Sequence, residues 1–130
     1  MLYEYKFKVM KVTDGDTIQG IVDLGWGVPL GFEDKPKTWR KLRLSDINAY
    51  ETTLRYGQTQ AEKELGLEAK RRVKEWLEGK WVFIRTMKDE KGSFERMLAC
   101  VWEEFTDDGP MGDDVGTRLL DLGLAVPYEG

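Results

Sequence analysis

The sequence contains no histidine and a single cysteine, Cys100, among its 130 residues. The absence of histidine excludes a Ser-His-Asp triad, a Cys-His pair and any zinc site built from histidine and cysteine. A lone cysteine cannot form an internal disulfide. Enzymatic chemistry in this chain would therefore rest on carboxylates, guanidinium groups and a hard cation.

Long apolar runs are also missing. No stretch approaches the roughly 20 apolar residues that cross a bilayer, and residues 1–6 lack the basic and apolar regions of a secretory signal. We therefore expect no membrane span and a cytoplasmic location. Hydrophobic residues make up 41% and charged residues 34% of the chain, which are values of a folded protein. A length of 130 residues fits one domain spanning 1–130.

The net charge of −4 argues mildly against a polyanionic partner. The charge is uneven, however, because residues 103–114 hold six acids and no base, so the rest of the chain is net basic. Basic residues cluster in two places, at Lys35, Lys37, Arg40, Lys41 and Arg43 and at Lys70, Arg71, Arg72 and Lys74. Such clusters are more often solvated faces than binding sites, and both interpretations stay open.

Alternating apolar and polar residues predict five strands. They cover residues 3–13, 17–22, 39–45, 81–85 and 96–102. Asp14-Gly15 is a tight-turn pair that joins the first two strands into a hairpin, with Asp16 where the second strand begins. In the third strand, Leu42 and Leu44 share one face and Arg43 lies on the other.

Apolar residues three or four apart from Gln58 onward predict an amphipathic helix that ends at Gly79. A short helix through Val115 and Leu122 is closed by Gly123. The acidic stretch between the fifth strand and this short helix, residues 103–114, is predicted to be a loop.

Residues 24–38 are rich in glycine and proline, which predicts a long loop or an irregular hairpin. We expect its aromatic residues, Trp26 and Phe32, to pack on the rest of the domain, with base stacking as the alternative.

The order is three strands, a helix, two strands and a short C-terminal helix. A helix between the third and fourth of five strands is the arrangement of an OB-fold, a β-barrel with helices that belongs to the α+β class. Such barrels often bind oligonucleotides or oligosaccharides.

Several short polar motifs have ordinary structural explanations when taken singly. Asp14-Gly15-Asp16-Thr17 is typical of a hairpin turn. Arg43 and Arg96 fit surface arginines with exposed salt bridges, and Glu51 fits a carboxylate near a helix. Only the combination and order of these motifs indicate a common site.

Together the motifs resemble the staphylococcal nuclease (thermonuclease) family. The resemblance rests on Asp14–Thr17, Arg43–Glu51, Arg96–Ala99 and Gly123–Ala125, which occur in the family's order with the helix in the expected place. The segment Asp23–Gly27 is similar to the phage and bacterial branch of that family. The resemblance covers nearly the whole chain and implies an SNase-like OB-fold.

It also implies a Ca²⁺-dependent endonuclease of DNA, or of both DNA and RNA, with low sequence specificity and 3′-phosphate products. The implied catalytic residues are Arg43 and Arg96, which grip the phosphoryl oxygens, and Glu51, which activates water. The implied metal ligands are Asp16, Asn48 and the backbone carbonyl of Ala49.

Further roles and departures follow from the same resemblance. Asp14 would hold metal-bound water, and Tyr128 lies near the position of a substrate-contacting tyrosine. Asn48 stands where well-known members have a second metal carboxylate, so we expect weaker metal affinity. Ala49 lacks the hydroxyl of the threonine found there, and Tyr50 replaces a proline that would stiffen the loop to Glu51.

Two other functions remain as alternatives. A non-catalytic OB-type module of the same lineage would bind nucleic acid or a protein; Asn48 and the acidic net charge favour it, while Arg43, Glu51 and Arg96 argue against it. A sugar hydrolase needs only two carboxyl groups, but no two acids pair convincingly for that role.

Overall fold

The computed structural model describes residues 3–45, 47–49, 59–87 and 96–127. The strands within these ranges are β1 Tyr3–Asp14, β2 Thr17–Asp23, β3 Pro29–Leu30, β4 Arg40–Leu44, β5 Ile47–Ala49, β6 Trp81–Met87, β7 Arg96–Trp102, β8 Glu104–Thr106, β9 Gly109–Met111 and β10 Ala125–Pro127. The helices are α1 Gln60–Leu77, α2 Val115–Asp121 and a 3-10 turn at Pro36–Thr38.

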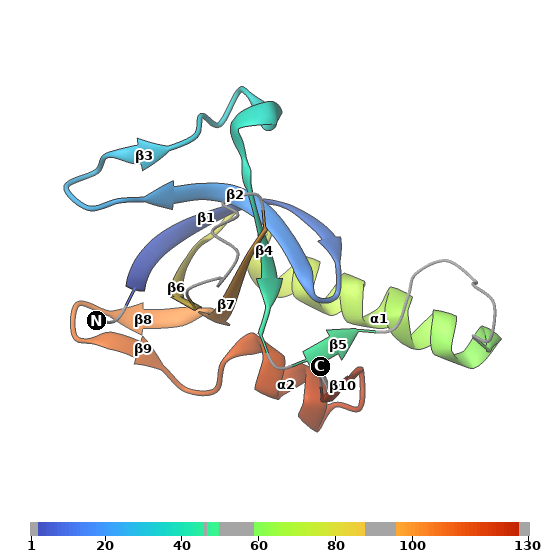
Figure 1. Ribbon diagram of the computed structural model, residues 1–130. Helices are drawn as coiled ribbons and strands as arrows, with labels where there is room; N and C mark the ends of the chain where they lie inside the picture. The colour runs from blue at the N-terminus through green and yellow to red at the C-terminus, as the bar shows by residue number, and fades with distance from the viewer. Residues whose placement is uncertain (1–2, 46, 50–58, 88–95, 128–130) are drawn as a thin grey trace.

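Five strands close into a barrel, seen in Figure 1. Their order is β1-β6-β7-β4-β2, and β2 pairs back with β1 to close the ring. All neighbours are antiparallel except β4 and β7, which are parallel. Alternate side chains such as Phe7, Leu42 and Ile84 fill the interior and are fully buried. The predicted five-stranded OB-fold is confirmed.

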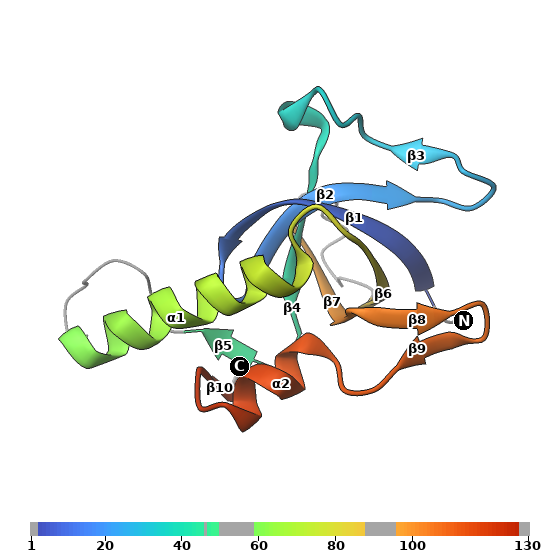
Figure 2. The same ribbon diagram turned by 180° about the vertical axis from the view of Figure 1, so that it is seen from behind.

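Helix α1 packs an apolar stripe against the barrel (Figure 2), and Ala69, Val73 and Leu77 belong to the barrel core. Thr59 caps its start, since the Thr59 hydroxyl oxygen accepts a 3.1 Å hydrogen bond from the Glu62 N–H. Gly79 follows its end with a φ of +81°, as predicted. None of the helices in the described ranges is both long and apolar enough to cross a bilayer.

A small second sheet extends the barrel next to α2. Strand β5 follows β4 closely and pairs with β10 near the C-terminus. Ile47 of β5 and Leu119 of α2 are both buried in the main core. This sheet has no signature in the sequence, because three-residue strands are too short to show an alternating pattern.

The prediction that residues 103–114 form a loop is wrong, since they contain the hairpin β8–β9. Its turn is an Asp-Gly pair at Asp108-Gly109, and Gly109 has a φ of +130°. The Phe105 ring lies 6.2 Å from that of Phe83 on β6 and fixes the hairpin to the barrel. Phe105 lies among six acidic residues, so the segment shows no alternation of apolar and polar residues that would predict strands.

Residues 24–39, here called the Trp26 arm, join β2 to β4 and stand out from the barrel (Figure 1). The irregular hairpin predicted for this region is confirmed, because β3 pairs with β2. The expected packing of its aromatic residues is wrong. Trp26 has a relative exposure of 103% and Phe32 one of 55%, since both project from the arm rather than onto the barrel core.

Candidate active site

Asp16 occupies the tight turn between β1 and β2. Its backbone carbonyl accepts a 2.8 Å hydrogen bond from the Leu44 N–H, which ties the turn to the end of β4. Its carboxylate Oδ1 accepts a 3.0 Å hydrogen bond from the Thr17 hydroxyl, and the side chain is only 14% exposed. The Asp-Gly-Asp-Thr motif is thus a hairpin turn, as its composition indicates, and it also holds a carboxylate in a sheltered position.

Arg43 lies on β4 and faces away from the core, as the buried neighbours Leu42 and Leu44 require. Its Nη2 is 3.8 Å from Oδ2 of Asp16, and its side chain is 16% exposed. This separation is that of an ion pair rather than of a hydrogen bond. The guanidinium and the carboxylate therefore form a half-buried pair at one edge of the barrel.

Arg96 is the first residue of β7, the parallel neighbour of β4. The register pairs Lys41 with Arg96 and Arg43 with Leu98. Paired residues share a face of a sheet, so backbone position 96 belongs to the face that carries Arg43. The side chain of Arg96 lies outside the part of the molecule that the structure describes.

The proposed metal ligands Asn48 and Ala49 are the last two residues of β5. Their backbones pair with Val126 and Ala125 of β10. Strand β5 starts shortly after Leu44, and the Leu44 N–H donates a hydrogen bond to the Asp16 carbonyl. The chain therefore brings β5 and the hairpin turn to the same end of β4. The side chains at 48 and 49 are not described.

Of three further residues named from the sequence, the structure describes one and leaves two undescribed. Glu51 and Tyr128 lie outside the described residues. Asp14 is the last residue of β1 and pairs with Thr17, directly beside Asp16. Of the site predicted from sequence, the structure therefore brings together Asp16 and Arg43 as side chains and positions 48, 49 and 96 as backbone.

A Ca²⁺ ion would suit the donors that these positions offer. Asp16 supplies a carboxylate with little exposure, Asn48 an amide oxygen and Ala49 a backbone carbonyl, and all three are hard oxygen ligands. Within the described ranges, no group of three or more His, Cys, Asp or Glu side chains gathers at one point. The proposed donor set is mixed, with a single carboxylate among its described members.

The registers also reveal a row of polar residues that the sequence analysis missed. Lys11 pairs with Gln19, Gln19 with Lys41, and Lys41 with Arg96, so the row crosses four adjacent strands on the outer face. Lys11 and Lys41 are exposed. Lys11 escaped notice because a bulge at Met10 shifts its register by one residue. The row lies directly beside the row of Arg43.

Comparison with known proteins identifies the family. The family model described as staphylococcal nuclease homologue matches residues 41–130, which include β4 except for its first residue, β5, α1 and all later elements. No curated protein matched the sequence. The matched range leaves out β1 and β2 but is well over half of the chain, and the chain therefore belongs to the staphylococcal nuclease family.

Proposed function

We propose that this protein is a Ca²⁺-dependent endonuclease that hydrolyses phosphodiester bonds of DNA, or of DNA and RNA, with little sequence preference. The half-buried pair of Asp16 and Arg43 carries the proposal, because it joins an anionic and a cationic group at one solvent-accessible edge. Membership of a nuclease family supports the reaction type.

Arg43 and Arg96 would hold the scissile phosphate. Each guanidinium offers parallel N–H donors that match two phosphoryl oxygens, a geometry that lysine does not offer. These charges would stabilise the extra negative charge that develops at phosphorus in the transition state. The position of Arg96 on the same face as Arg43, one strand away, is compatible with joint binding of one phosphate.

Glu51 would act as the general base. It would take a proton from water as the water oxygen bonds to phosphorus, and the bond to the 5′-oxygen would break. The leaving 5′-oxygen would take a proton from solvent, which gives a 3′-phosphate and a 5′-hydroxyl. Asp16, Asn48 and the Ala49 carbonyl would hold the cation, and bound Ca²⁺ would neutralise phosphate charge as a Lewis acid.

A cleavage assay tests the proposal directly. Plasmid DNA and single-stranded DNA are incubated with the protein in Ca²⁺ or in EGTA, and products are resolved by gel electrophoresis. We expect degradation in Ca²⁺ only, and a loss of about 10²–10³-fold in rate for Arg43→Ala, the usual effect of removing one charge-stabilising donor.

Glu51→Gln is the second variant, and we expect it to abolish cleavage while leaving binding in place. Arg71→Ala is the matched control, because Arg71 is an exposed arginine on α1 that pairs only with acids of its own helix among the described residues. Equal activity of Arg43→Ala and Arg71→Ala would contradict the proposal. Binding of DNA without any cleavage would indicate the non-catalytic module instead.

A further inference from the structure

The Trp26 arm is longer than its connection requires. Strands β2 and β4 are antiparallel neighbours, and a tight turn of a few residues joins such strands elsewhere in proteins. Here the chain instead uses all of residues 24–39 and adds β3 to the edge of the sheet. Long connections within a compact domain commonly serve a function.

The arm is held in place by its own hydrogen bonds. The Phe32 N–H donates to the Thr38 hydroxyl oxygen at 2.8 Å, and the Trp39 ring N–H donates to the Phe32 carbonyl at 3.0 Å. An ion pair of 2.6 Å between Lys8 and Glu33 fastens the arm to β1. The arm is therefore ordered before any ligand arrives, which lowers the entropy cost of binding.

Trp26 lies at the tip of the arm in a conformation that bulky residues avoid. Its φ is +58°, in the left-handed region, and its side chain is fully exposed. The tip is closed by a 2.8 Å hydrogen bond from the Leu24 N–H to the Val28 carbonyl. Within the described residues, nothing buries the indole in return for this strain. Strain of this kind concentrates at functional sites.

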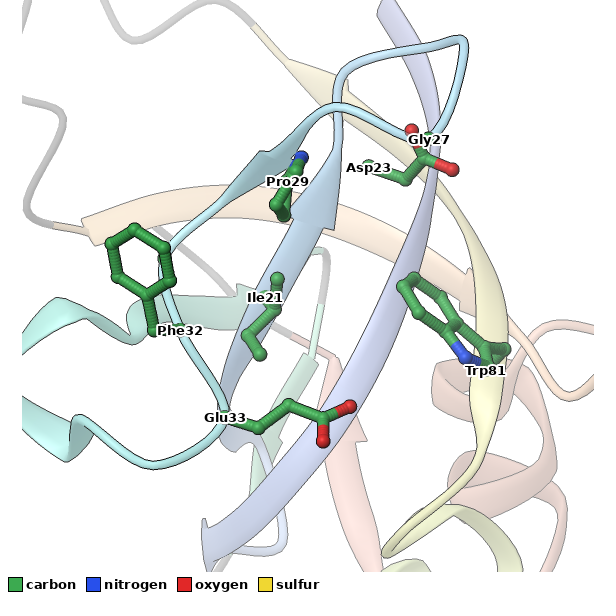
Figure 3. A pocket seen from close by; sticks show the side chains of 8 residues that line it. Ile21, Asp23, Gly27, Pro29, Phe32, Glu33 and Trp81 are labelled. Atoms are coloured by element: carbon green, nitrogen blue, oxygen red, sulfur yellow. The ribbon is translucent and has the colours of Figure 1, made fainter.

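A groove lies below the tip, between the arm and the barrel (Figure 3). It has a volume of about 300 Å³, at the small end of ligand pockets. Ile21 lies between Phe32 on the arm and Trp81 on β6, and both rings are about half exposed. The groove therefore adds two half-exposed rings to the fully exposed indole of Trp26 at the tip of the arm.

Two carboxylates, Asp23 and Glu33, line the groove, and Glu33 is paired with Lys8. Beyond the groove, exposed lysines on the arm and the sheet favour a polyanion. Lys35 and Lys37 are exposed on the arm, and Lys11 and Lys41 are exposed on the sheet between the arm and Arg43. None of these four lysines forms a salt bridge with another described residue. The Lys35 Nζ lies 5.1 Å from the Phe32 ring centroid, a cation–π contact that places positive charge beside an aromatic face.

The distances suit a continuous strand of nucleic acid. Ile21 and Thr17 are four residues apart on β2, roughly 13 Å at 3.3 Å per residue. Thr17 pairs with Arg43, so a strand of a few nucleotides would reach from the groove to the proposed phosphate site. Stacking on aromatic side chains needs bases with an open face, which a single strand provides and a duplex does not.

We propose that the Trp26 arm is a stacking platform for single-stranded nucleic acid. Bases stack on Trp26 and on the aromatic groove of Phe32 and Trp81. The exposed lysines of the arm and the sheet contact the phosphates of the strand as it runs towards Arg43. The proposal rests on the proposed function only in that the same strand continues to the cleavage site.

The test separates binding from cleavage. Affinity is measured in EGTA by fluorescence anisotropy, with a labelled dT12 strand and a duplex of the same length. We expect Trp26→Ala to weaken binding of dT12 about tenfold, Phe32→Ala to weaken it less, and Trp26→Phe to restore most of the affinity. Leu67→Ala is the control, since Leu67 is an exposed apolar residue on α1.

Cleavage in Ca²⁺ supplies the second readout. Trp26→Ala should lower kcat/KM for dT12 but not for the dinucleotide dTpdT, which is too short to reach the arm. Wild-type affinity of Trp26→Ala for dT12 would overturn the proposal and point to a protein ligand for the arm. Absence of cleavage with a retained tenfold binding defect would overturn the proposed nuclease activity but support the platform.

Discussion

Asn48 is a proposed metal ligand that contributes an oxygen but no charge. Calcium affinity rises with the number of charged ligands, and Asp16 is the only carboxylate among the described donors. We expect Asn48→Asp to lower the dissociation constant for Ca²⁺ about tenfold, measured by isothermal titration calorimetry. Asn48→Ala should weaken binding, and equal affinities of all three proteins would show that residue 48 is not a ligand.

Gly20 shows how a single residue fixes the barrel that carries the site. It lies on β2 facing inward, and a Cβ at this position would lie 1.9 Å from the Lys8 carbonyl oxygen, too close for any real contact. Backbone atoms of a paired strand cannot move away without breaking the β1–β2 hairpin. We expect Gly20→Ala to lower the free energy of unfolding by about 3 kcal/mol, measured with urea.

Gly109→Ala is a suitable comparison for Gly20→Ala. A Cβ at Gly109 meets no atom within 4 Å, but its φ of +130° is unfavourable for alanine. We expect a loss of about 1 kcal/mol from backbone strain alone. If the two variants were equally stable, steric exclusion at Gly20 would not explain the glycine there.

At the scale of elements, α1 carries a charge cluster with a defined pH dependence. Hydrogen bonds from Arg71 and then Arg72 lower the pKa of Glu68 from 4.5 to about 2. Because the folded pKa is below the unfolded one, the stabilising effect is complete above about pH 4.5 and disappears as the pH falls towards 2. The Glu68 side chain is 36% exposed, and solvent screens its ion pairs, so the effect is small.

The melting temperatures of wild type and Glu68→Gln test this cluster. We expect the variant to melt at a lower temperature at pH 7, and the difference to vanish as the pH approaches 2 or as salt screens the pairs. Glu64→Gln is the control, because Glu64 lies on the same helix and forms no salt bridge with a described residue. A difference that persists at pH 2 would exclude the ion pairs as its cause.

The elements that were predictable from sequence are those with a full periodic pattern. Helix α1 and the five barrel strands each bury one face, and their bounds follow within a few residues. Strands β5, β8, β9 and β10 have three residues each, too few for a period to appear. Their pairing depends on distant partners, such as Phe105 on Phe83, which local sequence does not specify.

The site was predictable in part for a related reason. The turn position of Asp16 follows from a local motif and the outward direction of Arg43 from strand alternation, and the structure shows both. Their place in a common site was implied only by the family resemblance. The row of Lys11, Gln19 and Lys41 depends on register across three strands and on a bulge, so it emerges only from the folded barrel. The strained φ of Trp26 likewise has no signature in the sequence.

At the scale of the whole molecule, the net charge of −4 conceals two oppositely charged regions. Figures 1 and 2 both show the Trp26 arm on one side of the barrel and the acidic hairpin β8–β9 on the other. Charges separated by more than about 10 Å are largely screened at 0.1 M salt. The basic face, formed by the exposed residues Lys11, Lys35, Lys37 and Lys41, should therefore bind a polyanion despite the overall negative charge.

The salt dependence of binding tests this separation of charge. Each phosphate contact with a single strand contributes about −0.7 to the slope of log K against log salt. Three to five contacts would give a slope of about −2 to −3.5 for dT12 in EGTA. The slope is measured by anisotropy between about 50 and 300 mM salt, a range set around physiological ionic strength. The double variant Lys11→Gln/Lys41→Gln should make the slope shallower by about 1.4, because two contacts are lost.

Neutralising the acidic hairpin provides the opposite comparison. Asp107→Asn/Asp108→Asn changes the net charge from −4 to −2, as much as the lysine variant changes it in the other direction. Because counterion release depends on local contacts with phosphate, this variant should keep the wild-type slope. A wild-type slope near zero would mean that binding involves no phosphate contacts. Equal and opposite changes in the two double variants would mean that net charge, rather than local contacts of the basic face, governs binding.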